Sequence, residues 1–318
     1  MPLREELKID FISMRWVALM FSTILVIGSI ALTMQKGLNF GIDFAGGTLI
    51  EIRLEEAPDL TALRQALNEL DLGNISIQEF GAPEDLMIRL PQQEGGEDST
   101  QGAIQTIRGA LNELYEEVDY RRVEFVGPQV GEELKMNGLY AILFSLAGIL
   151  IYIAIRFEGK FGIAAIIALA HDAAATIGLF ALTQMEFNLS TVAAVLMIAG
   201  YSINDTVVVF DRIRENLRKF KKMPLPELFN RSVNQTLSRT IMTSVTTLLA
   251  MFALWLFGGE VIQGFMYALI FGVLIGTYSS IFIAAPILLS LNVDRGAQSV
   301  EGETTDSNTP DTPSGANA

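Results

Sequence analysis

The stretch that decides the fold is WVALMFSTILVIGSIALTM, residues 16–34. It holds no charged side chain, and a helix of this length, at about 1.5 Å per residue, nearly crosses the roughly 30 Å hydrocarbon core of a bilayer. A secretory signal peptide is the competing interpretation, but its apolar core would be shorter and a small-x-small cleavage site would follow it. Ala31-Leu32-Thr33 is a poor cleavage site, so the run predicts a retained transmembrane helix.

Five more apolar runs follow a long polar stretch. The chain of 318 residues is half hydrophobic, with a mean hydropathy of +0.38, which is more apolar than soluble domains usually are. In the last run, Gly272 and Gly276 form a small-xxx-small pair that indicates close helix contact. The sequence therefore predicts a polytopic α-helical membrane protein with six transmembrane helices. The five further spans are expected at Gly138–Ile155, Phe161–Leu182, Leu189–Phe210, Thr240–Phe257 and Gly264–Leu289.

The composition excludes several classes of function. The chain has no cysteine and one histidine, which excludes thiol chemistry and leaves little material for a metal site. No phosphate-binding loop and no nucleophile–base–orienter set occurs, so we expect no enzyme activity and no cofactor. Residues 35–138 hold 8 Lys/Arg against 20 Asp/Glu, a net charge of −12 within a total of −14. Nucleic-acid binding needs a basic face and is set aside.

The acidic segment 35–137 is expected to be a small α+β domain. Gly47–Leu54 alternates like a strand, and residues 59–70 have apolar residues at helical spacing, with Asp59 as the N-cap. Two short strands follow at Ile75–Phe80 and Leu86–Leu90, joined by a turn at residues 81–85. A helix at Ser99–Tyr115 and a strand at Arg121–Val126 complete the segment. The order βαββαβ is that of the ferredoxin-like motif.

The distribution of Lys and Arg predicts the orientation. The N-terminus has three of them, the loop Arg156–Lys160 has two and the segment Asp211–Arg239 has eight, whereas Gln184–Asn188 and Gly258–Gln263 have none. With six crossings, all basic loops and both termini lie in the cytoplasm and the acidic domain lies outside. The expected division is a cytoplasmic N-terminus at 1–15, helix 1 at 16–34, a periplasmic domain at 35–137, helices 2–6 at 138–290 with a basic cytoplasmic loop at 211–239, and a disordered cytoplasmic tail at 291–318.

The basic segment 211–239 is also amphipathic. Such a segment can lie on anionic lipid headgroups or contact a protein partner. Lipid is the simpler of these two interpretations.

Asp205 is the ionisable residue that stands out within a span. A charge at the centre of a bilayer costs at least about 2.5–3.5 kcal/mol, so an intramembrane carboxylate needs an explanation. Burial favours its protonated form and a nearby cation favours its ionised form, and Arg239 is the nearest candidate cation in the sequence. The pair is therefore a candidate proton relay, with a static ion pair between helices as the alternative.

Other polar residues within the spans are weaker candidates for the same relay. His171 and Asp172 lie near the middle of the third span. As helix neighbours they point about 100° apart, so we expect one to face a helix interface and the other a polar cavity. Both proton transfer and a purely structural hydrogen-bond role stay open for them. Asn204 in the fourth span and Thr243 in the Ser/Thr-rich fifth span are the remaining candidates, although helix packing accounts for most such hydroxyl groups.

Six motifs in order resemble the SecD/SecF family, on its SecF side. The resemblance covers nearly the whole chain apart from the C-terminal tail, and Ala173, after His171-Asp172, stands where relatives often have a β-branched residue. The motifs are FGIDFAGGT at 40–48, VGPQVG at 126–131, His171-Asp172, GYSINDTVVVFDRIREN at 200–216, SRTIMTSVTT at 238–247 and GTYSSIFIAAP at 276–286.

The resemblance implies an accessory subunit of the bacterial Sec preprotein translocase in the inner membrane. Family members pair with SecD, resemble transporters of the resistance-nodulation-division superfamily, and use the proton motive force to complete export after the SecA ATPase has acted at the SecYEG channel. In that family the Asp and Arg that match Asp205 and Arg239 are tied to proton passage. The implied partners are SecD, SecYEG, SecA, YajC, YidC, preprotein substrates and membrane lipids.

Two other functions remain as alternatives. One is a self-sufficient proton-coupled antiporter of small molecules with a related fold, acting as a homo-oligomer. The other is a structural scaffold for translocon assembly, in which Asp205 and Arg239 only hold helices together.

Overall fold

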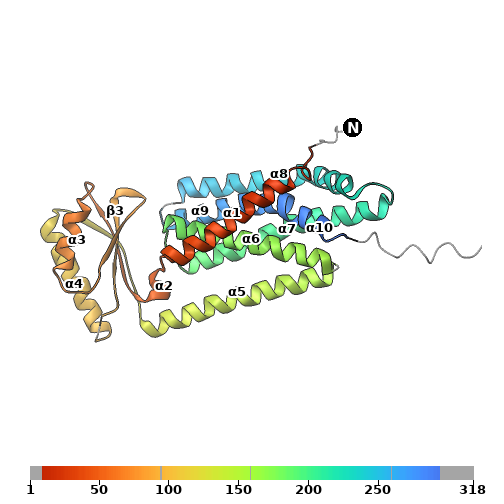
Figure 1. Cartoon of the computed structure of the whole chain (residues 1–318). Helices are drawn as coiled ribbons and strands as arrows, with labels where there is room; N and C mark the ends of the chain where they lie inside the picture. The colour runs from red at the N-terminus through yellow and green to blue at the C-terminus, as the bar shows by residue number, and fades with distance from the viewer. Residues whose placement is uncertain (1–8, 94, 158, 259, 294–318) are drawn as a thin grey trace, which may run out of the picture.

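A bundle of long helices with a small α/β domain at one end makes up the computed structural model, which describes residues 9–93, 95–157, 159–258 and 260–293 (Figure 1). In these residues, six helices are long and apolar enough to cross a membrane, which confirms the predicted fold class. The bundle consists of α1 (Arg15–Lys36), α5 (Pro128–Arg156), α6 (Gly159–Thr183), α7 (Leu189–Lys219), α8 (Leu225–Phe257) and a last span formed by α9 (Glu260–Ser279), the π-helix η1 (Ser280–Ala284) and α10 (Ala285–Ser290).

Three helices extend beyond the apolar runs that predicted them. Helix α5 begins at Pro128 rather than Gly138, α7 continues to Lys219, and α8 begins at Leu225. The extensions are polar, so hydropathy located the membrane-crossing part of each helix but not its ends. The predicted basic loop at 211–239 is therefore a helical hairpin, which projects at the far end of the bundle, opposite the α/β domain (Figure 1).

The last span is not the single α-helix expected at Gly264–Leu289. The π-helical turn η1 interrupts it, and Pro286 lies in the first turn of α10. A proline within a helix cannot donate a hydrogen bond to the residue four positions earlier, and a widened turn accommodates that loss. The expected tail at 291–318 lies outside the described residues from position 294 onward, as do residues 1–8 of the expected N-terminal segment.

The α/β domain has the predicted ferredoxin-like topology. Its four strands form an antiparallel sheet in the order β2-β3-β1-β4. Asp59 caps α3 as expected, because its carboxylate accepts a hydrogen bond from the backbone nitrogen of Thr61 at 2.8 Å. The elements of the domain are β1 (Gly47–Leu54), α3 (Leu60–Asn68), β2 (Ser76–Phe80), β3 (Ala82–Leu90), α4 (Glu97–Leu114) and β4 (Val118–Val126).

The turn between β2 and β3 is tighter than predicted. The sequence suggested a turn over residues 81–85, but β3 begins at Ala82, which pairs with Phe80. The register then shifts, so that Glu79 pairs with Leu86. This bulge contains Pro83, which has no backbone N–H to donate to a ladder, and it explains why the segment looked like a turn.

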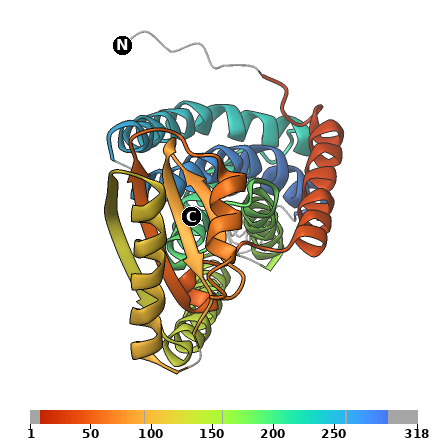
Figure 2. The same ribbon diagram turned by 90° about the vertical axis from the view of Figure 1, so that its left-hand side faces the viewer.

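Both faces of the sheet are covered. Helices α3 and α4 lie on the outer face (Figure 2), over a core that includes Ile50, Ile88 and Ile107, which are fully buried. The opposite face is turned toward the bundle (Figure 1), where Leu49 and Glu51 are buried on β1. The alternation of apolar and polar residues predicted for β1 therefore does not separate a buried face from a solvent-exposed face, because both faces of the strand are buried.

The motif FGIDFAGGT joins the domain to the bundle. It forms the short helix α2 (Ile42–Ala45) and an aromatic cluster in which Phe40 and Phe44 contact Phe187 of the α6–α7 connection. Gly47 follows with a φ of +110°, and a Cβ there would overlap the carbonyl oxygen of Leu90. This position requires glycine for both its backbone conformation and its contact.

The most buried spans of the bundle are α6, α7 and the last span. Gly272 lets α9 approach α7, because a Cβ at this position would overlap the side chain of Ile198. A Cβ at Gly276 would lie 3.1 Å from the Cβ of Ser202. The two glycines thus make the close helix contact that their spacing predicted.

Candidate functional site

Asp172 is the centre of a buried polar cluster between α6, α7 and α9. Its side chain is completely shielded, and its Oδ2 accepts hydrogen bonds from Ser202 Oγ on α7 and from Ser279 Oγ on α9, the latter at 2.7 Å. Its Oδ1 lies 2.9 Å from Nδ1 of His171. Three polar side chains therefore surround this carboxylate, and the two serine donors tie α6 to α7 and to α9.

The helix positions of His171 and Asp172 suggested that their side chains point to different places, but the structure brings the two together. The two neighbouring side chains bend toward each other and share the 2.9 Å hydrogen bond. The His171 ring lies 6.2 Å, between centroids, from the ring of Tyr278, whose hydroxyl donates to the carbonyl oxygen of Ala18 on α1 at 2.9 Å. The Nε2 atom of His171 is buried, and no described residue forms a hydrogen bond with it.

Asp205 lies in a different environment, on the face of α7 that contacts α8. Its residue is 2% exposed, and among the described residues no donor reaches its Oδ2. Tyr201, one turn earlier on α7, donates to Ser244 Oγ of α8 at 3.1 Å. Because the hairpin makes α7 and α8 antiparallel, one turn further along α7 corresponds to one turn back along α8. Asp205 is therefore level with Thr240, whose buried Oγ1 also has no partner among the described residues.

Arg239 precedes Thr240 on α8 and so lies at the level of Asp205. The two side chains do not come within ion-pair distance of each other, in contrast to the ion pairs found elsewhere in the described chain. Arg239 is exposed on the surface of this single chain. The arrangement combines a buried carboxylate, one oxygen of which has no donor among the described residues, and an exposed cation at the same level of the neighbouring helix.

The structure does not bring the remaining candidates into either cluster. Asn204 is exposed. Thr243 is half-buried, and its hydroxyl donates only to carbonyl oxygens of its own helix, those of Arg239 at 3.1 Å and Thr240 at 2.9 Å. Ser202 and Ser279 were not identified from the sequence as partners of Asp172. The available signal was that a buried carboxylate needs hydrogen-bond donors and that each serine lies in one of the six motifs, at 200–216 and 276–286.

Two family models match this chain. The model described as "Protein export membrane protein SecD/SecF, C-terminal" matches residues 106–294. The model described as "SecD/SecF GG Motif" matches residues 32–58, which include Gly46 and the constrained Gly47. The chain belongs to the SecD/SecF family.

Relatives in the SecD/SecF family align over almost the whole chain. The protein translocase subunit SecF of Rickettsia bellii (strain OSU 85-389) is 51% identical over 292 residues, which cover 90% of this chain and 95% of that protein. The subunit SecF of Cereibacter sphaeroides is 48% identical over 298 residues and 92% of each chain. This confirms the resemblance carried by the six motifs.

Two solved structures share the fold of this SecD/SecF chain. The crystal structure of SecDF, a translocon-associated membrane protein from Thermus thermophilus, superposes with a TM-score of 0.82 at 36% identity over 91% of this chain. SecDF in a super-membrane-facing form gives a TM-score of 0.66 at 37% identity over 90% of this chain. This chain spans 40% and 39% of those two SecDF chains.

The junction between the domain and the bundle is a second polar site in this SecD/SecF chain. Arg89 of β3 forms an ion pair at 2.9 Å with Glu186 of the α6–α7 connection, and their side chains are only 12% and 16% exposed. Arg89 also donates to Asn39 Oδ1 at 2.9 Å, and Asn39 donates to the carbonyl oxygen of Gln184 at 2.8 Å. This network borders a cleft of about 790 Å³ between the sheet and the bundle.

Glu51 lines the same cleft from β1. Burial raises the pKa of its carboxyl, and the charge of Arg122 opposes this only in part. Arg122 Nη1 lies 3.4 Å from Glu51 Oε1, whereas Arg122 Nη2 lies 2.5 Å from Glu124 Oε1. The guanidinium of Arg122 therefore interacts mainly with Glu124.

Proposed function

We propose that this chain is an accessory subunit of the Sec preprotein translocase that works with SecD and uses the proton motive force to complete export after the SecA step. The relatives named protein translocase subunit SecF support the place in Sec translocation. The observation that carries proton coupling is Asp205, a carboxylate buried within a span with one oxygen lacking a donor in the described chain. Such a group can gain or lose a proton without breaking a hydrogen bond at that oxygen.

The partnership with SecD is supported by the surface next to Asp205. Arg239 and Asn204 are exposed in this single chain, and a cation that faces hydrocarbon is costly. A partner helix that covers this face would remove that cost. SecDF chains, of which this chain spans about two fifths, contain further segments that could supply such a helix. The SecYEG channel, SecA, YajC, YidC and preproteins are further proposed partners.

The proposed location is the bacterial inner membrane, with both termini in the cytoplasm. Both described ends of the chain lie at the far end of the bundle (Figure 1). The basic hairpin 211–239 and Arg156 lie at that end too, and Lys/Arg-rich connections face the cytoplasm. The acidic α/β domain would then act on the periplasmic side, where an emerging preprotein appears.

Asp205→Asn tests the proposed proton coupling. The full-length variant, co-expressed with SecD, is assayed for preprotein translocation in inverted membrane vesicles, with and without an ionophore that collapses the proton gradient. We expect intact assembly with SecD and loss of the gradient-dependent stimulation. Asp211→Asn is the matched control, because Asp211 lies on the same helix but its side chain is 40% exposed and pairs with Arg156. Normal stimulation in Asp205→Asn would refute the relay.

Purification in mild detergent tests the alternative of a self-sufficient proton-coupled antiporter. The proposed function requires a SecD-like subunit to co-purify in fixed proportion. A pure homo-oligomer with full activity would instead support the antiporter.

A further inference from the structure

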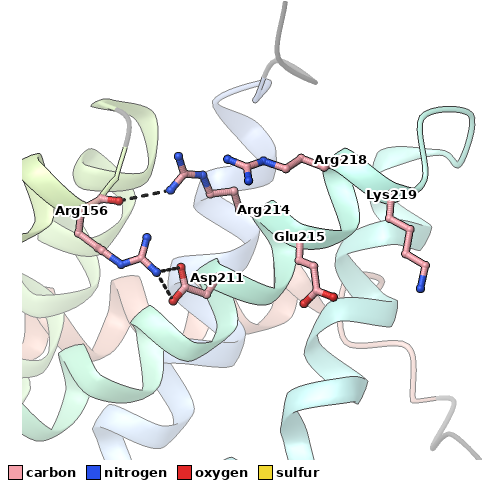
Figure 3. A pocket seen from close by; sticks show the side chains of 6 residues that line it. All are labelled: Arg156, Asp211, Arg214, Glu215, Arg218 and Lys219. Carbon is pink, nitrogen blue, oxygen red and sulfur yellow. Dashed lines mark hydrogen bonds and ion pairs between the residues drawn. The ribbon is translucent and has the colours of Figure 1, made fainter. Parts of the chain in front are cut away.

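A cationic pocket lies at the far end of the bundle, where α5 ends beside α7. Its volume is about 450 Å³, and Figure 3 shows the side chains around it. Four cations and two carboxylates line it. They are Arg156, Asp211, Arg214, Glu215, Arg218 and Lys219.

Both carboxylates of this pocket already have a cationic partner. Arg156 Nη2 lies 2.7 Å from each oxygen of Asp211, and Glu215 accepts a hydrogen bond from Arg212 at 2.8 Å. Both acids are thus neutralised within the protein. Among the described residues, no carboxylate is paired with the other cations of the pocket.

Three pocket cations are left over. Lys219 lies over the ring of Phe220, 5.5 Å from its centroid, which leaves Arg214 and Arg218. Their spacing of four residues puts them on the same face of α7. Figure 3 shows the side chain of Arg218 extending toward Arg214, whose own guanidinium is directed at Arg156. Arg214 donates to the carbonyl oxygen of Arg156 at 3.4 Å, while no hydrogen bond or ion pair joins Arg218 to any described residue. Like charges at this spacing repel each other. Two neighbouring guanidinium forks on one helix face are suited to one anion with several acceptor oxygens, above all a phosphate.

The surface beside the pocket indicates where that phosphate comes from. Directly before Arg156, α5 presents Ile151 and Ile155, which are 60% and 83% exposed. Residues this apolar and this exposed, on a membrane-spanning helix, contact acyl chains. The pocket therefore opens where the lipid-facing surface of α5 meets the polar end of the bundle.

We propose that this pocket binds the phosphate of an anionic phospholipid headgroup, held by Arg214 and Arg218, with the acyl chains along Ile151 and Ile155. The site is separate from Asp205 and does not depend on the proposed function. It would fix a lipid between the ends of α5 and α7, at the base of the projecting hairpin.

The test uses the purified full-length chain in micelles with equal amounts of phosphatidylglycerol and phosphatidylcholine that carry the same acyl chains. Native mass spectrometry compares the two retained lipids. A basic residue near an anionic lipid surface contributes about fivefold in affinity, so Arg214→Gln/Arg218→Gln should lower the preference for phosphatidylglycerol roughly 25-fold. Arg218→Gln alone removes no described contact, so it should preserve the melting temperature and lower the preference about fivefold.

The control is Lys221→Gln/Lys222→Gln, which makes the same change of charge in the connection between α7 and α8, outside the pocket. It should keep the wild-type preference, and so should wild-type protein with millimolar inorganic phosphate added. An unchanged preference in the Arg214→Gln/Arg218→Gln variant would overturn the proposal. An equal loss in the lysine control would show a nonspecific charge effect and also overturn it. Displacement of the lipid by inorganic phosphate would assign the pocket to a free anion instead.

Discussion

Removing the two serine hydroxyls that bind Asp172 is the most direct test of the buried cluster. In Ser202→Ala/Ser279→Ala, Asp172 Oδ2 loses both of its donors, while the backbone and the packing volume hardly change. Because the carboxylate is completely buried, water does not readily replace the lost donors. The fold should therefore lose the two hydrogen bonds that Asp172 of α6 makes to α7 and to α9.

The expected magnitude follows from hydrogen bonds measured between helices in membranes. Such bonds contribute about 0.6 kcal/mol on average and at most about 1.7 kcal/mol each. Two bonds give a loss of about 1–3 kcal/mol in the free energy of unfolding. The assay is reversible unfolding of the full-length chain in mixed micelles of a mild detergent and dodecyl sulfate.

Thr243→Val/Thr246→Val is the matched control, because it also removes two span hydroxyls. These two bond only to carbonyl oxygens of their own helix, so the variant should change stability by less than about 0.5 kcal/mol. A second check introduces the serine substitutions into Asp172→Ala, where they should cost little because the acceptor is gone. Equal losses in the serine and threonine variants would refute the assigned role of Asp172.

Three further outcomes follow from the described contacts. Arg89→Ala should leave Glu186 buried and unpaired and weaken docking of the α/β domain by about 3 kcal/mol. The measurement is the rate of proteolysis at the junction, which should rise in Arg89→Ala and return toward the wild-type rate when Glu186→Ala is added. Burial raises the pKa of Glu51, so the protonated form stabilises the fold below the usual Glu pKa, and this contribution disappears as pH rises through the raised value. Glu51→Gln should therefore raise the melting temperature at pH 8 but not at pH 4. Gly272→Ala should cost about 1–3 kcal/mol by overpacking, whereas Gly200→Ala, which has open space around it, should be neutral or slightly stabilising in the same unfolding assay.

Local signals in the sequence were sufficient for much of the fold. The cap at Asp59 is set by residues within one turn of it, and each apolar run predicted a span because hydrocarbon thickness sets its length. The ends of α5 and α8 were missed because their polar extensions carry no hydrophobic signal. The π-helical turn at Ser280–Ala284 was not predicted, although Pro286, which follows it in the first turn of α10, removes a backbone donor at that place.

The candidate site was less predictable because its bonds link distant parts of the chain. Asp172 was recognised as unusual, but its donors Ser202 and Ser279 lie 30 and 107 residues away. No local pattern distinguishes these two serines from the other hydroxyl residues in the spans. Asp205 and Arg239 could be singled out as candidates because the cost of a charge in a membrane applies wherever the residue lies in the fold.

The two buried aspartates therefore suit different tasks. A change in the protonation of Asp172 would disturb hydrogen bonds to three side chains on three spans, so this carboxylate suits a fixed structural role. Asp205 has an oxygen without a donor in the described chain and faces α8, whose Arg239 lies outside ion-pair distance. A small movement of α8 relative to α7 could change the separation of these two charges, and with it the balance between the protonated and ionised forms of Asp205. Under the proposed function, proton uptake at Asp205 would therefore be linked to the α7–α8 contact, while the hydrogen bonds of Asp172 join α6, α7 and α9.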